Sequence, residues 1–334
     1  MTRVRFDRAV RADARALPIA DATVDCVVTS PPYWRKRDYG LADQIGQEAT
    51  AAEYARTIVA CLTEWKRVLR PHGSVFLNVG DTYERQSLAG IPFLIEQLAA
   101  QNGWLVRNRI IWTKSGGIPE PSRRRLANRH EYVLHLAMSR RYYYDMFGYS
   151  AHFGNGTNPG DIWSMALERT LNAHLAPFPE ELVHRALLLS CPAQVCERCG
   201  SPRERILERT FELDVSRPQA RRALEIARDA KLTIAHLRAI QATGISDAGK
   251  ALKIQSGTGR NSKAVQGLAA EAKRALGGYF REFTFAKRTS AGFTSCACGD
   301  GFVPGVVLDP FAGTGTTQRV AARLGLSSIG CDLA

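Results

Sequence analysis

The sequence contains no apolar run of the ~18–20 residues that a membrane-spanning helix needs, although 45% of its 334 residues are hydrophobic. Its first residues, MTRVRFDRAVRADAR, also lack the apolar core of a secretory signal. We therefore expect a cytoplasmic globular protein with enough apolar side chains for a large core. The length suits one large α/β domain, or one domain with a substantial insertion.

Acidic residues are scarce relative to basic ones. The chain has 32 Asp and Glu against 45 Lys and Arg, a formal net charge of +13. The excess is concentrated, because residues 201–290 hold 18 Lys and Arg but only 9 Asp and Glu. This distribution favours a polyanionic partner, nucleic acid above all. A scattered, solvated basic surface is the alternative.

A glycine-rich segment near the C-terminus, DPFAGTGTT at 309–317, lacks the Lys-Ser/Thr pair of a phosphate-binding P-loop, which disfavours ATP. A short apolar strand over Gly305–Leu308 precedes it. A helix over 316–324 and a strand over Ser327–Cys331 follow, and that strand ends at Asp332. This order is typical of a Rossmann-like unit whose terminal acid binds ribose hydroxyls. We expect a nucleotide-like cofactor here.

A second motif, TSPPYW at 29–34, has the residue types needed to hold an exocyclic amino group for alkylation. The Ser30 side chain and the Pro31 carbonyl can accept both N–H bonds, which favours a tetrahedral nitrogen with an available lone pair. The two prolines stiffen the backbone that carries these acceptors. Tyr33 offers a face for an extruded base, and Trp34 would extend that wall. A Pro-Pro turn with an aromatic plug is the alternative for this motif alone.

The remaining pattern up to residue 192 alternates strands and helices. The predicted strands are Ala22–Thr29, Ser74–Val79, 105–113, Glu131–Ala137 and Tyr142–Tyr144. The predicted helices are 51–69, 91–102 and Phe178–Ser190, and Lys114–Arg129 is predicted to be a loop. We expect a Rossmann-like α/β sheet.

Between Pro192 and Val303 the pattern changes to Ala/Arg/Lys-rich helices. We predict an inserted, mainly helical domain over 193–302, between two core segments, 1–192 and 303–334. Leu232–Ala251 has the helix, glycine turn and helix of a helix-turn-helix, and Asn261–Phe283 adds another basic helical stretch. A rigid helical bundle with a solvated basic face is the alternative.

The candidate DNA-binding residues are basic side chains of this insertion and of the 114–129 loop. They are Lys250, Lys253, Arg260 and Lys263 in the insertion, and Arg123, Arg124 and Arg125 in the loop.

Eight cysteines in a cytoplasmic protein do not indicate a disulfide framework. Four of them, Cys196, Cys199, Cys296 and Cys298, form two closely spaced pairs that bracket the insertion. Their spacing suits a structural Zn²⁺ site with four thiolate ligands. Four reduced cysteines without a ligand are the alternative.

Several stretches together resemble the DNA amino-methyltransferases that use S-adenosylmethionine. They are TSPPYWRKRDYGLADQIGQE, LNVGDTY, RNRIIWTK, RHEYVLHLA, YYYD, FPEEL and LDPFAGTGTT. The catalytic block precedes the cofactor block, as in the circularly permuted β group of that family. The resemblance covers roughly residues 1–192 and 303–334 and implies a Rossmann-like methyltransferase sheet.

By that resemblance, Ser30, Pro31, Pro32 and Tyr33 form the catalytic motif. Asp332 would bind the ribose, Asp13 would lie near the adenine and Phe178 beside the methionine moiety. The implied cofactor site consists of Asp13, Thr29, Phe178, Asp309, Phe311, Gly313, Gly315, Thr316 and Asp332.

Serine at position 30 is the version of the motif mostly associated with N4 of cytosine, whereas adenine N6 enzymes more often have Asp. We therefore expect a site-specific methyltransferase acting on a flipped cytosine in double-stranded DNA, with adenine N6 as the alternative. Structured RNA or a protein glutamine are further alternatives, and a DNA-binding regulator without turnover is one from another class. The Pro-Cys motif of C5-cytosine enzymes is missing. The sequence does not identify the recognition sequence, a cognate restriction endonuclease or the oligomeric state.

The resemblance has one departure. Members of the family usually continue past the ribose-binding acid into another helix, whereas this chain ends two residues after Asp332. We expect either a trimmed chain or an N-terminal element that covers this edge of the sheet.

Overall fold

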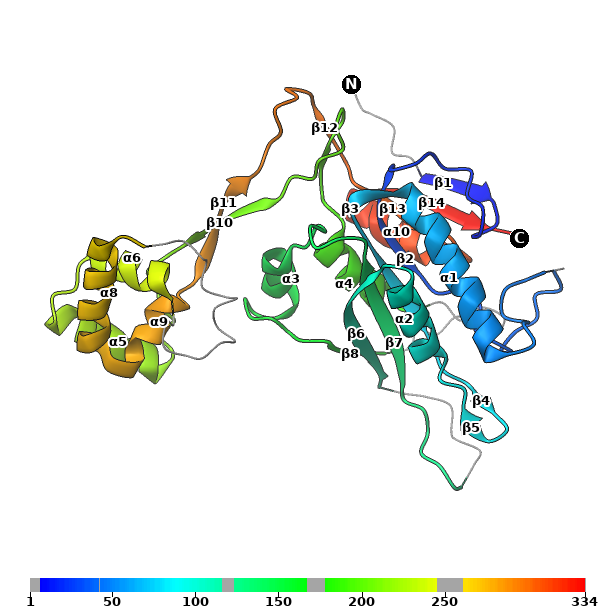
Figure 1. The fold of residues 1–334 in the computed structure, drawn as a ribbon, viewed down its shortest axis with the longest axis horizontal. Coiled ribbons are helices and arrows are strands. Elements are labelled where there is room, and N and C mark those ends of the chain that lie inside the picture. The colour runs from blue at the N-terminus through cyan, green and yellow to red at the C-terminus, as the bar shows by residue number, and fades with distance from the viewer. Residues whose placement is uncertain (1–6, 42, 116–122, 167–177, 245–260, 334) are drawn as a thin grey trace. The chain divides into compact units, whose positions relative to one another are not determined.

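The structure is a computed structural model that describes residues 7–41, 43–115, 123–166, 178–244 and 261–333 (Figure 1). The chain divides into two compact units. One comprises Met1–Glu204 with Ser295–Ala334, and the other is Arg205–Thr294. Within the described ranges, every helix is too short or too polar to traverse a lipid bilayer.

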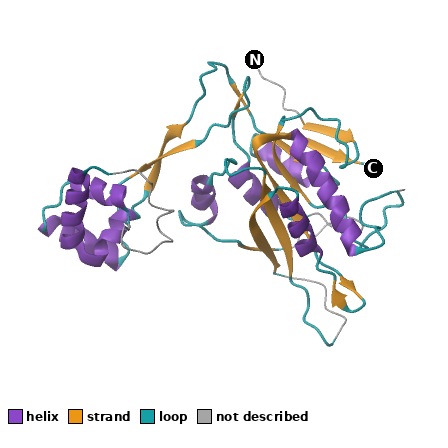
Figure 2. Ribbon diagram, in the orientation of Figure 1, coloured by secondary structure: helices purple, strands orange, loops and turns teal. Residues whose placement is uncertain are grey.

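The first unit is an α/β structure (Figure 2). Its strands are β1 (Asp7–Arg11), β2 (Val24–Thr29), β3 (Leu69–Val79), β4 (Tyr83–Glu84), β5 (Ser87–Leu88), β6 (Leu105–Lys114), β7 (His130–Ala137), β8 (Ile162–Met165), β9 (Val195–Cys196), β12 (Phe302–Val303), β13 (Val306–Asp309) and β14 (Ser327–Asp332). Its helices are α1 (Ala51–Val68), α2 (Ile91–Gln101), α3 (Met146–Phe153), α4 (Glu180–Ser190) and α10 (Thr316–Arg323).

Eight of the described strands form one sheet in the order β1-β14-β13-β2-β3-β7-β6-β8. The strands from β1 to β3 are parallel, and β7 is antiparallel to both β3 and β6. In this order β13 lies directly beside β2, although most of the chain separates them in sequence. The predicted Rossmann-like α/β sheet is confirmed.

Both faces of the sheet are covered by helices, which explains why β2 is buried along its whole length. Val27, Val75 and Leu77 pack with α1 and α2 on one face. Val28 and Phe76 pack with α4 and α10 on the other. Alternate residues of one strand therefore enter opposite halves of the core.

The helix α1 begins at a capping box, in which Thr50 and Glu53 each bond the other's backbone amide. Tyr54, Ile58, Leu62 and Trp65 recur at helical spacing along its buried face. These signals explain why the predicted helix over 51–69 agrees with the structure.

The outer edge of the sheet is covered by β1, which pairs in parallel with β14, with Arg11 opposite Asp332. The sequence left two alternatives for the edge beside Asp332, a trimmed chain or a covering N-terminal element. An N-terminal element, β1, does lie at this edge. The sequence pattern did not predict β1 as a strand.

The second unit contains a two-stranded antiparallel ladder and a cluster of helices. Its elements are β10 (Arg205–Arg209), α5 (Pro218–Asp229), α6 (Ile234–Thr243), α8 (Lys263–Leu276), the 3₁₀ turn η1 (Gly277–Tyr279), α9 (Phe280–Thr284) and β11 (Arg288–Phe293). The helices pack around Ala223, Ile240, Leu276 and Phe283. The basic helical stretch predicted over 261–283 agrees with α8, η1 and α9.

The structure describes only the first half of the predicted helix-turn-helix. The helix α6 ends at Thr243 and is capped by Gly244, and the rest of the predicted motif, up to Ala251, lies outside the described residues. Lys250, Lys253 and Arg260 also lie outside the described residues.

Two expectations differ from the structure. The compact second unit begins at Arg205 and ends at Thr294, inside the predicted limits of 193 and 302, so both cysteine pairs belong to the first unit. The prediction of a strand at Tyr142–Tyr144 was wrong. Instead, the Tyr142 and Tyr144 rings pack against the buried His135. This aromatic run therefore contributes to packing without forming a strand of the sheet.

Candidate active site

A cavity of about 560 Å³ is lined by both sequence motifs. Ser30–Tyr33, which follow β2, form part of its wall, and Phe311–Gly313, which follow β13, form another part. Because β2 and β13 are parallel neighbours, their carboxyl ends meet at one edge of the sheet. The fold thus brings the two motifs together.

The carboxyl group of Asp309 connects the two motifs. Thr29 Oγ1 donates a hydrogen bond of 2.5 Å to Asp309 Oδ1, and Thr317 Oγ1 donates one of 2.7 Å to Oδ2. The amide of Phe311 also donates to Oδ1, at 3.1 Å. Thr29 and Asp309 are buried and lie behind the cavity wall, so they position the site and do not line it.

Most of the other residues expected to hold the cofactor do line the cavity. They are Asp13, Phe178, Phe311, Gly313, Thr316 and Asp332. Asp332 Oδ2 accepts a hydrogen bond of 2.8 Å from the amide of Gly313, whose φ of +47° suits glycine. Gly315 does not line the cavity; it caps α10 with a φ of +75°.

Two of these cavity residues, Asp13 and Phe178, lie in or near ion pairs. The guanidinium of Arg15 bonds both oxygens of Asp13 and thereby lowers the pKa of that carboxyl. Phe178 precedes α4, whose Glu180 pairs with Arg319 and Arg323 of α10. These pairs join α4 to α10, the helix that follows the glycine loop.

Tyr33 is held by a hydrogen-bond network at its hydroxyl group. Tyr33 Oη donates to Glu131 Oε2 at 2.5 Å and accepts from Asn78 Nδ2 at 2.8 Å. Asn78 also donates to Glu131, whose other oxygen pairs with Lys114. Burial raises the pKa of Tyr33 well above its ordinary value, and the charge of Glu131 adds to this. The phenol therefore stays protonated and donates.

Ser30 is only loosely bound to this network. Its Oγ lies 3.4 Å from both Tyr33 Oη and Asn78 Nδ2, near the outer limit for a hydrogen bond. The hydroxyl lines the cavity and is free to turn toward a ligand donor.

The Tyr33 ring lies against Gly80, just beyond the end of β3. A Cβ at position 80 would lie 2.7 Å from Tyr33 Cε2, so only glycine leaves room for the ring in this position.

The expectation that Trp34 extends the cavity wall was wrong. Trp34 is 1% exposed, and its Nε1 donates to the Glu48 carbonyl at 2.8 Å, which anchors the loop from behind.

The polar residues that line the cavity and that the sequence did not reveal include Arg15, Asn78, Lys114 and Glu131. Three of them lie at or near strand ends. Lys114 ends β6, Asn78 is the penultimate residue of β3, and Glu131 is the second residue of β7. The available signal was a polar side chain at the end of an otherwise apolar strand, on the edge that already carries both motifs.

The basic loop candidates lie in the connection between two strands of the sheet. Arg123, Arg124 and Arg125 lie between β6 and β7, the strands that carry the cavity residues Lys114 and Glu131. All three are exposed, and the guanidinium of Arg125 lies 3.7 Å from the centre of the Tyr83 ring. Lys263, the first residue of α8, is exposed on the second unit.

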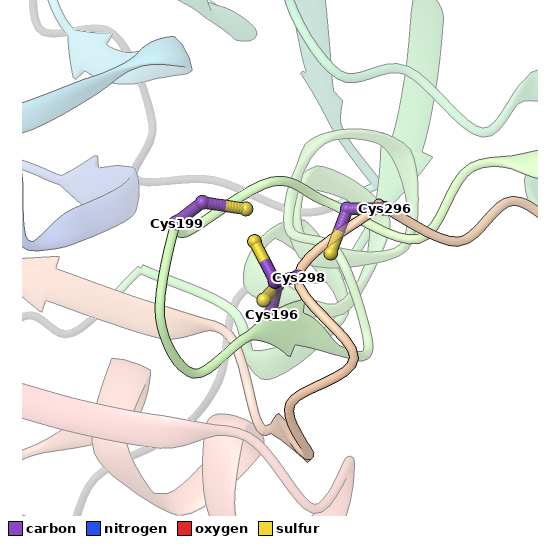
Figure 3. Close-up of side chains that lie close together, drawn as sticks. All are labelled: Cys196, Cys199, Cys296 and Cys298. Carbon is purple, nitrogen blue, oxygen red and sulfur yellow. The ribbon is translucent and has the colours of Figure 1, made fainter.

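The four paired cysteines converge on one point of the first unit (Figure 3). The Sγ atoms of Cys196, Cys199, Cys296 and Cys298 all lie within 4.8 Å of one another. The structure thus shows a cluster that could hold a metal ion, as the spacing predicted. Cys191, five residues upstream, is not part of it.

The buried Asp309 should make stability pH-dependent. Burial raises its pKa from 3.8 to about 6, so the folded state holds this proton more tightly than the unfolded state. The resulting stability is present below pH 4 and is lost as the pH rises through 6. Between pH 4 and pH 7.5, the unfolding free energy of the wild type should therefore fall by roughly 2–3 kcal/mol relative to Asp309→Asn. Urea unfolding of both proteins measures this, and parallel pH profiles would contradict the assignment.

The sequence and the fold are similar to those of known DNA-modifying enzymes. Type II methyltransferase M.Cfr9I of Citrobacter freundii is 31% identical over 207 residues, which cover 53% of this chain and 68% of that protein. M.XycI of Xanthomonas campestris pv. cyanopsidis is 32% identical over 200 residues, covering 51% and 66%. Among solved structures, PvuII DNA methyltransferase (cytosine-N4-specific) shares the fold with a TM-score of 0.54 and 13% identity, covering 98% of this chain and 81% of that one.

The sequence also matches the description of a protein family. Residues 24–194 and 303–334, more than half of the chain, match the family described as DNA methylase, which groups N6 and N4 methylases. The matched segments contain both motifs and most of the cavity residues, and they leave out the second unit and the cysteine cluster. The chain belongs to the DNA methylase family.

Proposed function

We propose that the chain transfers a methyl group from S-adenosylmethionine to N4 of a cytosine flipped out of double-stranded DNA. The observation that carries the proposal is the single cavity lined by both Ser30–Tyr33 and the glycine-rich loop. Family membership supports DNA methylation in general. The choice of cofactor and of base rests on the chemistry of this cavity.

The cavity fits a nucleoside-containing cofactor. Its volume of about 560 Å³ lies within the usual range for small-molecule sites. Asp332, Phe311 and Gly313 would hold the adenosine, and Asp13 and Phe178 would complete the site. Asp332 is already oriented by the Gly313 amide. S-adenosylmethionine, when bound, supplies an electrophilic methyl group on a sulfonium.

The opposite part of the wall suits an amino group attached to a flat ring. Ser30 and Pro31 both line the cavity and offer a hydroxyl and a carbonyl as neutral acceptors, and two accepted N–H bonds would free the nitrogen lone pair. The Tyr33 ring, held by Gly80 and Glu131, offers a fixed surface for stacking a flipped base. The amino group loses its proton readily once it is alkylated, so the site needs no strong base.

Cytosine N4 is favoured over adenine N6 because position 30 is Ser, the residue mostly associated with cytosine enzymes of this family. One solved methyltransferase that shares this fold is described as cytosine-N4-specific, which is consistent with this choice. Adenine N6 is the second candidate. A regulator without turnover is disfavoured, because Ser30, Pro31, Pro32 and Tyr33 all line the cavity.

The charge distribution supports DNA as the substrate. Arg123, Arg124 and Arg125 are exposed in the connection between β6 and β7, where they would contact the phosphate backbone. The basic second unit, including Lys263 and the candidates Lys250, Lys253 and Arg260, would contribute to target recognition. The relatives are named Type II methyltransferases, so a cognate restriction endonuclease is a proposed partner and the cytoplasm the proposed place of action.

The proposal predicts N4-methylcytosine in DNA treated with this protein and S-adenosylmethionine. Nucleosides from digested DNA would be analysed by mass spectrometry. Ser30→Ala should lower the methylation rate about 10²–10³-fold, because one preorganised acceptor is lost, while cofactor binding stays intact. Ser87→Ala, on the exposed β5, is the matched control and should retain the wild-type rate. N6-methyladenine alone would favour the second candidate, and full activity of Ser30→Ala would contradict the role of its hydroxyl.

Gly80→Ala tests whether the position of the Tyr33 ring matters. The added methyl would overlap the ring at 2.7 Å and displace it from its stacking position. We expect at least a tenfold loss of methylation rate with little change in cofactor affinity, measured by equilibrium binding. Gly267→Ala, in α8, where a Cβ would meet nothing within 4 Å and the backbone is helical, controls for replacing a glycine. Wild-type turnover of Gly80→Ala would show that the ring position is not required.

A further inference from the structure

The cysteine cluster lies outside the residues that match the DNA methylase family, which stop at 194 and resume at 303. Methyl transfer as proposed above does not use it. Cys199 is exposed while Cys196 is buried, yet both contribute to one group of sulfurs. The proposed methyl transfer does not explain why four cysteines, one of them exposed and one buried, gather at this place.

The positions of the four sulfurs suit a tetrahedral metal site. A Zn–S bond of ~2.3 Å places the sulfurs of a tetrahedron about 3.8 Å apart, and these four lie within 4.8 Å of one another. They come from two turns, and Figure 3 shows the four side chains directed toward a common space. Four thiolates with no open position are the ligand set of a structural site.

The backbone holds both turns in place. The amide of Gly200 donates to the Cys196 carbonyl at 2.9 Å, and that of Cys196 donates to the Ser201 carbonyl at 2.9 Å. Gly200 and Gly299, which follow the two cysteine pairs, have φ values of +67° and +72°. Phe302 of β12 pairs with Cys196 of β9, so the two turns are also joined by a short ladder.

The first turn also contacts the core through Gly200. A Cβ there would lie 2.8 Å from Arg70 Nε, so the Arg70 side chain rests against the turn. Arg70 in turn pairs with the fully buried Asp25 at 2.7 Å. Asp25 Oδ2 also accepts from the amide of Val306, the first residue of β13, at 2.7 Å.

We propose that Cys196, Cys199, Cys296 and Cys298 bind one structural Zn²⁺, and that this site holds Arg70 on Asp25 and thereby fixes the start of β13. The chain leaves the first unit at Glu204 and returns at Ser295, so the metal joins the residues just before and just after that excursion. The strand it supports, β13, leads directly into the glycine-rich loop.

The metal itself is tested on the full chain, purified under reducing conditions without added metal. Elemental analysis should find one zinc per chain, and the variant with Cys199→Ser and Cys298→Ser should retain at least tenfold less. Cys191→Ala is the matched control and should keep its zinc. A wild-type protein that neither contains nor takes up zinc, that holds iron instead, or that forms disulfides within the pairs would overturn the assignment.

Thiol labelling of the wild type keeps the test independent of how the variants fold. Cys199 is exposed, so an alkylating reagent should modify it quickly unless its sulfur is bound to a metal. A strong chelator should therefore increase the labelling rate of Cys199 at least tenfold, and added zinc should reverse this. Equal rates with and without the chelator would contradict a metal at the cluster.

Hydrogen exchange tests the proposed support of β13. Removing zinc should increase amide exchange at least tenfold in a peptide that covers residues 303–309, and should leave a peptide over β7 unchanged. Arg70→Met should reproduce this increase while retaining zinc. If zinc binds but exchange over 303–309 does not change on its removal, the structural role is wrong. Neither readout involves methyl transfer, so failure here would leave the proposed function untouched.

Discussion

The hydrogen bonds to the Asp309 carboxylate are the constraint on which the site depends. They join Thr29, at the end of β2, to Thr317 in α10, across a sequence separation of 280 residues between Thr29 and Asp309. A buried carboxylate without these donors would be costly, so the pairing is strongly favoured. The parallel register of β2 with β13 places the Ser30–Tyr33 motif beside the glycine loop, and the Asp309 carboxylate bonds residues on both sides of this junction.

The segment from Ser30 to Tyr33 is held at both ends. Thr29 is tied to β13 through Asp309, and Tyr33, four residues later, is tied to β7 through Glu131. The parallel part of the sheet thus anchors one end of the segment and the antiparallel part anchors the other. Ser30 lies between these two anchors, where its hydroxyl keeps only long contacts within the protein. A rigid segment with one loosely bound acceptor suits recognition of a small polar group.

Much of this arrangement could be predicted from the sequence, because β2, β13, α1 and α10 are local patterns with clear starts and ends. The joining of the two motifs followed from the rule that parallel strands end at one edge. Glu131 and Lys114 were missed because their role depends on antiparallel pairing between β6 and β7, which a single sequence does not specify. Tyr142–Tyr144 and Trp34 were misassigned because aromatic residues suit strands, pockets and cores alike. Long-range contacts such as that of Gly80 with Tyr33 leave no trace in local pattern.

The central claim is that one cavity holds the cofactor and the target base between the two motifs. A crystal structure with S-adenosylhomocysteine tests it most directly. The account predicts the ribose at Asp332 and the sulfur directed toward Ser30 and Pro31, within the cavity lined by both motifs. Density for the cofactor outside this cavity, or with its sulfur turned away from Ser30, would contradict the account.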